Sequence, residues 1–176
     1  MAVETVKSAS VTNLDAAPRV PNTAGRGAAG YLWQINDYAL VPAAASVTSK
    51  FFLVRVPCDI VLKELIFAAD AMAAGKFDLG LWYSASSTDG TPAANKGLVI
   101  DQDFFASDID CASAVAPTDV TNESGNYPLQ NRNQPLWQAA GLSAMPGGFF
   151  DIIAVVHTTA VTTGAAYIHA DARYVW

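Results

Sequence analysis

The chain has 176 residues, of which 52% are apolar and only 15% are charged, against roughly 25% charged residues in an average soluble domain. This length predicts a single domain with enough apolar side chains for a sandwich or barrel core. Ten Lys and Arg stand against sixteen Asp and Glu, a formal net charge of −6, which argues against nucleic acid as a partner because phosphate backbones are bound by clustered basic side chains.

Membrane and disulfide patterns are also missing from the sequence. No stretch approaches the ~18 consecutive apolar residues of a membrane span, and residues 1–13 lack the basic start and apolar run of a signal peptide. We therefore expect no membrane partner. Cys58 and Cys111 lie far from any Cys-x-x-Cys or Cys/His spacing, so they are predicted to be buried free thiols and not metal ligands.

The first 30 residues differ in composition from the rest of the chain. They contain Ser, Thr, Asn, Pro and Gly in short alternation and no large aromatic residue before Tyr31. This predicts an extended N-terminal arm over residues 1–30 and a folded body over residues 31–176. Two interpretations of the arm stay open: a loose chain end, or a tether that orders on a neighbouring subunit by pairing with an exposed sheet edge.

Alternation of apolar and polar residues predicts strands throughout the body. The predicted strands cover residues 31–36, 50–56, 59–69, 76–83, 97–100, 148–157 and 165–176. Residues 59–69 also fit a helix, because Leu62, Leu65 and Ile66 are spaced by three and four, but their β-branched residues favour a strand. Residues 76–105 are typical of a hairpin with a long loop that contains Asp89-Gly90.

The periodic pattern weakens between this hairpin and the last two strands. Asp103 to Ser107 predict a turn that places two Phe side chains in the core, and residues 107–133 predict the longest loop, a candidate contact surface. Pro135 and Gly141 bracket a short predicted helix. Seven or eight strands with at most one helix predict an all-β fold, an antiparallel two-sheet sandwich that is jelly-roll-like.

The two histidines, His157 and His169, are each at the end or in the polar phase of a predicted strand. They would lie close together if the last two strands pair. A metal site or an acid–base pair is then the alternative to surface or interface residues, but such a metal site needs a further His and a carboxylate at a close spacing that this chain lacks.

Carboxylates offer two further alternatives. Asp101-x-Asp103 and the similar pair at 108–110 resemble calcium-binding loops but lack the Gly and distal Glu of an EF-hand, so solvated turn residues are the simpler interpretation. Asp78 and Glu64 could flank a glycosidic bond, yet nothing in the sequence fixes their separation. No nucleophile, phosphate-loop or dinucleotide motif occurs, so we expect no enzyme, no cofactor and no metal.

The four tryptophans leave one more choice open. Trp33, Trp82, Trp137 and Trp176 could stack on sugars, although large aromatic side chains in a sandwich more often anchor the core or an interface.

Four segments carry a family resemblance. They are VKSASVTNLDAAPRVPNTAG at residues 6–25, DLGLWY at 78–83, VIDQDFFASDID at 99–110 and TNESGNYPLQNRNQPLWQAAGL at 121–142. Their most specific parts are residues 103–107, residues 122–125 with Tyr127, and residues 135–137. Together they resemble a group of small virion proteins of tailed bacteriophages that are often encoded near the major capsid protein.

The resemblance implies a structural role and brings no catalytic residues with it. We expect a capsid decoration or cement protein, synthesised in the host cytoplasm and located on the outer surface of the capsid. Its expected partners are the major capsid protein and further copies of itself, most simply as a homotrimer at local three-fold sites of the shell. The alternative is a head-fibre or tail-associated receptor- or glycan-binding module, which predicts an exposed Trp or Tyr cluster near a polar pocket at a loop end.

Two sets of contact residues follow from the decoration hypothesis. The capsid-contact arm is expected to use Val11, Asn13, Arg19, Val20, Pro21 and Arg26. The candidates for contacts between subunits are Tyr127, Trp137, His157 and His169.

Overall fold

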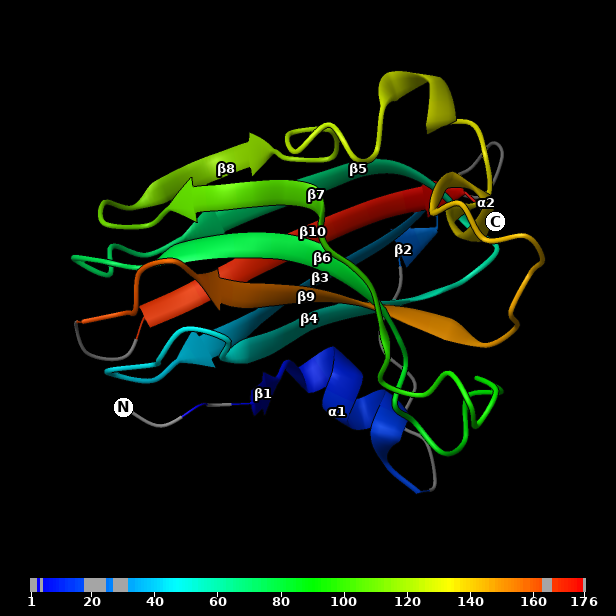
Figure 1. Cartoon of the computed structure of the whole chain (residues 1–176), viewed down its shortest axis with the longest axis horizontal. Coiled ribbons are helices and arrows are strands. Elements are labelled where there is room, and N and C mark those ends of the chain that lie inside the picture. The colour runs from blue at the N-terminus through cyan, green and yellow to red at the C-terminus, as the bar shows by residue number, and fades with distance from the viewer. Residues whose placement is uncertain (1–2, 4, 18–24, 27–31, 163–165, 176) are drawn as a thin grey trace.

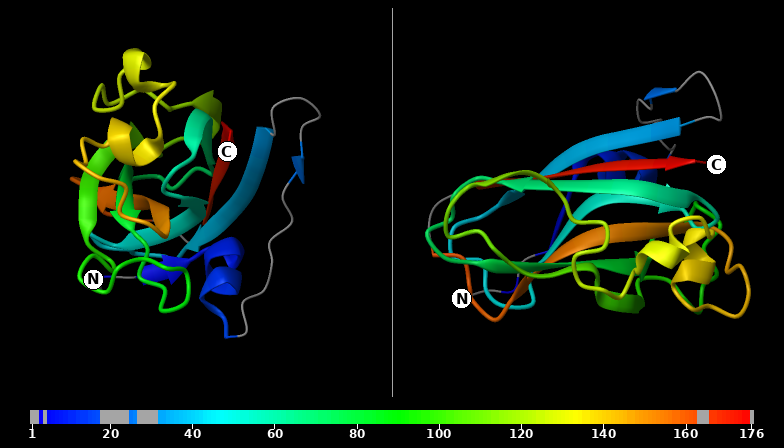
Figure 2. Two further views of the ribbon diagram at one scale, coloured as in Figure 1. Left: turned by 90° about the vertical axis from the view of Figure 1, so that its right-hand side faces the viewer. Right: turned by 90° about the horizontal axis from the view of Figure 1, so that it is seen from above.

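The computed structural model describes residues 3, 5–17, 25–26, 32–162 and 166–175, which form a sandwich of two five-stranded sheets (Figures 1 and 2). The elements in chain order are β1 (Thr5–Lys7), α1 (Ala9–Asp15), β2 (Gly25–Arg26), β3 (Leu32–Val41), β4 (Lys50–Pro57), β5 (Val61–Ala69), β6 (Lys76–Tyr83), β7 (Val99–Asp110), β8 (Val115–Asp119), the 3₁₀ turn η1 (Leu129–Asn131), α2 (Leu136–Ala139), β9 (Phe149–His157) and β10 (Ala166–Val175).

The strand order is that of a jelly roll. One sheet runs β1-β4-β9-β6-β7 and the other β2-β3-β10-β5-β8. From β3 to β10 the chain changes sheet at every connection except the β6–β7 hairpin, which gives the two Greek keys of this fold. Pairing is antiparallel throughout except between β1 and β4. The predicted all-β, two-sheet, jelly-roll sandwich is therefore confirmed.

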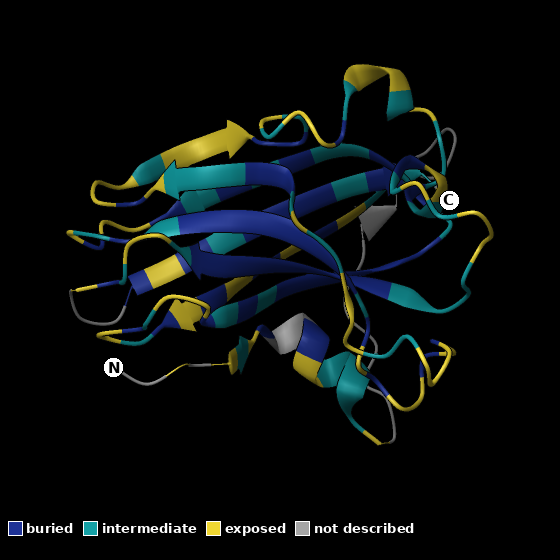
Figure 3. Cartoon of the chain, in the orientation of Figure 1, coloured by how far each residue is buried: buried dark blue, intermediate teal, exposed yellow. Residues whose placement is uncertain are grey.

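The two sheets differ in how far the residues on their outer faces are buried. Strands β6 and β9 are buried along nearly their whole length (Figure 3). Their outward residues include Trp82, Ile153 and Val155, which form a small second cluster with Phe52 outside the main core. Strand β10 instead alternates between buried and more exposed positions, as its sequence predicted. The sheet that contains β10 therefore keeps one face open.

The middle of β7 departs from the prediction. Residues 103–107 were predicted to form a turn, but they lie inside a continuous twelve-residue strand. Leu79 pairs with Ala106 and Leu81 with Asp101, so the residues between them on β7 bulge over the single residue Gly80. A bulge breaks the alternation of a strand, which is why consecutive buried residues in this segment indicated a turn.

Three other predictions have clear outcomes. The predicted segment 59–69 forms a strand over Val61–Ala69 and not a helix, and the short helix predicted between Pro135 and Gly141 is α2. The predicted long loop at 107–133 contains β8, an edge strand whose residues are mostly exposed. Cys58 and Cys111 are buried free thiols, and burial raises the pKa of Cys111 to about 12.

The N-terminal segment is folded where the sequence predicted an extended arm. Residues 5–7 form β1 beside β4, and Ser8 caps α1 by accepting a hydrogen bond from the Val11 N–H. Val11 is fully buried. The helix was missed because one seven-residue helix gives too few periodic positions to identify. Residues 18–24 and 27–30 of the predicted arm lie outside the described part of the chain.

A buried ion pair fastens α1 to the body. Arg55 on β4 is fully buried and donates two hydrogen bonds to Asp151 on β9, at 2.5 and 2.9 Å. It also donates to Asp15, the last residue of α1, which a second salt bridge joins to Lys7. Burial alone would raise the pKa of Asp15, but the hydrogen bonds of Lys7 and Arg55 outweigh it and lower that pKa.

This arrangement predicts a pH effect on stability. Because the folded-state pKa of Asp15 lies below its ordinary value of 3.8, its ion pairs stabilise the fold above that value and are lost as the pH falls through the folded-state pKa. We expect the free energy of unfolding, from urea titrations, to fall more steeply below about pH 4 in the wild-type protein than in Asp15→Asn. An identical pH dependence of the two proteins would contradict this assignment.

Candidate functional site: the open face of the β3-β10 sheet

We call the outward surface of β3, β10, β5 and β8 the open face. Exposed large apolar side chains gather on it, namely those of Leu32, Tyr38, Leu40 and Tyr167. Strand register places Leu40 opposite Tyr167 and Tyr38 opposite His169. Adjacent strands thus bring these side chains together although the sequence separates them by more than a hundred residues.

An aromatic cluster lies toward the β3 side of the open face. The ring centroids of Tyr38 and Tyr167 are 5.3 Å apart in an edge-to-face arrangement, and those of Tyr38 and His169 are 5.6 Å apart. Tyr38 is 51% exposed and Tyr167 43% exposed. We call Tyr38, Leu40 and Tyr167 the aromatic band.

Next to the band, the open face carries a polar network centred on Asp171. This carboxylate is buried, and its Oδ2 accepts hydrogen bonds from Gln34 Nε2 at 2.8 Å and from Arg173 at 3.2 Å. Arg173 also donates to Glu64 at 2.6 Å. The other oxygen of Asp171, Oδ1, has no hydrogen-bond partner among the described residues.

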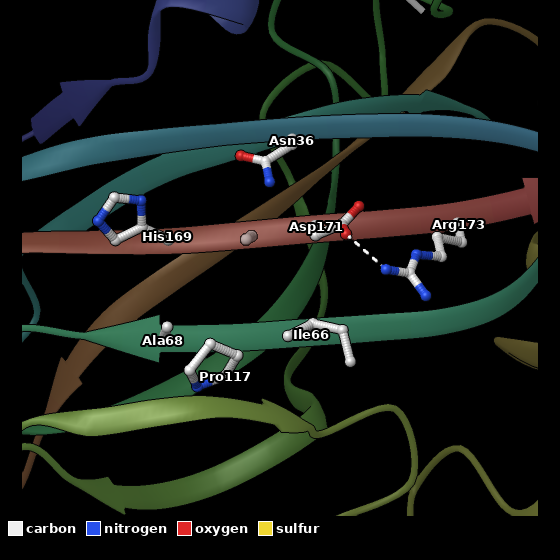
Figure 4. Close-up of a pocket in the computed structure, with 8 residues that line it drawn as sticks. Asn36, Ile66, Ala68, Pro117, His169, Asp171 and Arg173 are labelled. Carbon is white, nitrogen blue, oxygen red and sulfur yellow. Dashed lines mark hydrogen bonds and ion pairs between the residues drawn. The ribbon is translucent and has the colours of Figure 1, made fainter. Parts of the chain in front are cut away.

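A hollow of about 530 Å³ opens beside this network (Figure 4). It is lined by Asn36, Ile66, Ala68, Pro117, His169, Ala170, Asp171 and Arg173. Ala68 pairs with His169 across the β5–β10 ladder, and its methyl group leaves space where a larger side chain would fill the face. The hollow therefore combines an apolar floor with four polar side chains from β3 and β10.

The residues predicted for the capsid-contact arm are not gathered at this face. Val11 is fully buried against the body, so its assignment as a capsid contact is wrong. Asn13 is half-buried on α1, and Arg26 lies in β2. Residues 19–21, which hold the predicted contacts Arg19, Val20 and Pro21, lie outside the described part of the chain.

The four interface candidates fall in different places. Tyr127 is fully buried and donates a hydrogen bond to the Leu62 carbonyl at 3.2 Å, so its assignment to an interface is wrong. Trp137 is half-buried and packs against the core. Only His169 lies on the open face, beside the aromatic band. Its role in contacts between subunits stays a prediction.

The two histidines are on opposite sheets, since β9 and β10 do not pair. His157 Nδ1 lies 3.2 Å from Asp78 and 3.5 Å from Asp108 at the end of β9. Asp108 also accepts a hydrogen bond from the Thr158 hydroxyl and forms a salt bridge with Lys76. This cluster of polar and ionisable side chains joins the ends of β6, β7 and β9.

The proposed carboxylate pair of a glycosidase is not formed. Glu64 is on β5 and Asp78 on β6, in different sheets, and Asp78 accepts hydrogen bonds from Gln102 and from the Asp108 N–H. Among the described residues, no group of three or more His, Cys, Asp or Glu side chains is placed to hold a metal ion. None of the described helices has the length and apolar character needed to cross a membrane.

Sequence reasoning missed most of the open face, although part of the signal was present. The alternation of β10 already put Tyr167, His169, Asp171 and Arg173 on one side of the strand. The partners Tyr38 and Asn36 could not be found, because nothing in the sequence gives the register of β3 against β10. Of the tryptophans, Trp82 is buried, and Trp33 and Trp137 are half-buried against the core.

The open face thus carries exposed aromatic side chains beside a polar hollow. This cluster is on strands, whereas the alternative of a receptor- or glycan-binding module predicts an exposed Trp or Tyr cluster at a loop end. No protein-family model matches the chain, and neither a curated protein nor a solved structure matches it.

Proposed function

We propose that this protein is a structural component of a bacteriophage virion, a decoration protein that binds the outer surface of the assembled head and stabilises it. Its partners are the major capsid protein and other copies of itself, in a homotrimer. The observation that carries the proposal is the aromatic band, in which Tyr38, Leu40 and Tyr167 are each between 41% and 51% exposed on one sheet face.

The chemistry of the band favours a protein surface as its occupant. Contiguous exposed apolar side chains mark contact sites, whereas single exposed apolar residues are common on any protein surface. Tyrosine is also enriched at the centres of protein interfaces. Only 15% of the residues are charged, so little desolvation of ions opposes a large contact. The net charge of −6 disfavours nucleic acid as the occupant.

The folded N-terminal segment changes which residues are expected to contact the capsid. Val11 and Asp15 bind the body of their own chain, so deletion of residues 1–30 would remove part of the fold and could not isolate a docking function. The band offers a cleaner target, because its side chains point to solvent.

The test compares two leucine variants. Leu40, in the band, is 41% exposed, and Leu129, on η1 and outside the band, is 68% exposed. We expect Leu40→Asp to lower the occupancy of the protein on phage heads that lack it by about tenfold or more, because the interface would bury an unpaired carboxylate. Leu129→Asp should bind as the wild-type protein does.

Occupancy is measured by sedimenting the heads and quantifying the bound protein. Equal occupancy for Leu40→Asp and the wild-type protein would show that the band is not the docking surface. Failure of the wild-type protein to bind heads would overturn the decoration role itself.

A further inference from the structure

The hollow on the open face contains a buried acceptor without a donor. Asp171 is 9% exposed, and while its Oδ2 receives N–H groups from Gln34 and Arg173, its Oδ1 has no partner among the described residues. In Figure 4 this second oxygen is turned away from Arg173. A buried carboxylate oxygen without a donor costs free energy, so the site favours a ligand that brings an O–H or N–H group.

A second polar side chain comes from the neighbouring strand. Asn36 on β3 is directly opposite Asp171 in the β3–β10 ladder, and both line the hollow. Its amide supplies donors and an acceptor. Asp171 and Asn36 together can therefore bind a group that both donates and accepts hydrogen bonds, which is the property of a hydroxyl.

The rest of the lining suits the faces of a carbon ring. His169 presents a flat aromatic ring, and Pro117, Ile66 and Ala68 present aliphatic carbon. The volume, about 530 Å³, is within the range of about 300–1,000 Å³ typical of small-molecule sites. A ligand with apolar C–H faces and a polar rim would match both kinds of surface.

Other ligand classes fit less well. A metal cation would meet one carboxylate that already accepts two hydrogen bonds, one of them from the Arg173 guanidinium. A phosphate or other anion would meet the carboxylate of Asp171. The Arg173 guanidinium is already paired with Glu64 and Asp171. A hydrocarbon would leave Asp171 Oδ1 buried and unpaired, at the full desolvation cost.

We propose that the hollow lined by Asn36, His169 and Asp171 binds a neutral saccharide. One ring packs on His169 and Pro117, and its hydroxyls donate to Asp171 Oδ1 and exchange hydrogen bonds with Asn36. The lining of the hollow includes none of the aromatic-band residues Tyr38, Leu40 and Tyr167. Saccharide binding therefore does not depend on docking to a capsid, and the isolated protein suffices to test it.

The experiment is a titration of the ¹⁵N-labelled full-length protein, followed by amide chemical shifts. The probes are maltotriose, cellotriose, chitotriose and lactose, with inorganic phosphate and calcium chloride as separate arms, each raised to about 10 mM so that millimolar sites saturate. We expect at least one saccharide to give saturable shifts at the amides of Asn36, Ala68 and residues 169–173. No shift with any saccharide, or shifts at these amides with phosphate or calcium alone, would overturn the proposal.

Three variants make the test specific. Ala68→Phe fills the floor of the hollow, and Asp171→Asn removes the charged acceptor, so each should weaken saccharide binding by about tenfold or more. Ala68→Phe leaves the polar network in place, so it still tests the site if Asp171→Asn has a folding defect. Leu40→Asp, in the band, should bind the saccharide as the wild-type protein does. Undiminished binding by Ala68→Phe, or loss of binding in Leu40→Asp, would refute the assignment to the hollow.

Discussion

Replacing Arg55 by Met is expected to lower the free energy of unfolding by about 3–5 kcal/mol, because it leaves the carboxylate of Asp151 buried without its counterion. Arg55 and Asp151 are both fully buried, and two N–H groups of the guanidinium bind the two carboxylate oxygens. The substitution also removes the bond from Arg55 to Asp15 that holds α1. Urea titration of the variant measures the loss.

Two further variants serve as controls for this measurement. The salt bridge of Lys7 with Asp15 is partly exposed, with 38% of the lysine side chain accessible, so Lys7→Met should cost less than about 1 kcal/mol. The double variant Arg55→Met/Asp151→Leu removes both charges and should regain most of the stability. A single Arg55→Met variant as stable as Lys7→Met would contradict the buried charge pair.

Gly80→Ala is expected to destabilise the fold by about 3 kcal/mol or more, as severe overpacking does. A Cβ atom at position 80 would overlap the carbonyl oxygens of Asp101 and Gln102 in the bulge of β7. These are backbone atoms of a paired strand, so they cannot move aside without opening the β6–β7 hairpin. Thermal unfolding of the variant measures the effect.

The matched control is Gly125→Ala. A Cβ atom at Gly125 would meet nothing within 4 Å, although the backbone there has a positive φ of 83°. We expect this control to lose only the cost of left-handed backbone, about 1–2 kcal/mol. Equal losses in the two variants would mean that close approach of β7 does not explain the glycine at position 80.

How far the sequence predicts this fold is shown by β10 and β7. The strict alternation of β10 identifies a half-buried strand because one face of its sheet stays open. In β7 the bulge over Gly80 buries Phe104, Phe105 and Ala106 in succession. The position of such a bulge depends on the partner strand, so no local sequence pattern predicts it. The number of predicted strands was enough to predict the jelly-roll class, but it could not predict the bulge in the pairing of β6 with β7.

The candidate site was predictable only in part, for a related reason. His169 was identified as a contact residue from its place in the polar phase of the last strand, and it does line the open face. Asn36 and Tyr38 become its neighbours only through the register of β3 against β10, which long-range packing sets. Val11 and Tyr127 were assigned to contacts with other chains because the sequence does not show which of its own apolar surfaces will cover them.

The central claim is that this jelly roll decorates the outside of a phage head through its aromatic band. Image reconstruction of the virion that carries the protein tests it most directly. The account predicts density for the sandwich on the outer surface of the capsid, in threefold clusters, with Tyr38, Leu40 and Tyr167 against a neighbouring protein. Density confined to the tail or a head fibre, or a particle that lacks the protein, would contradict it.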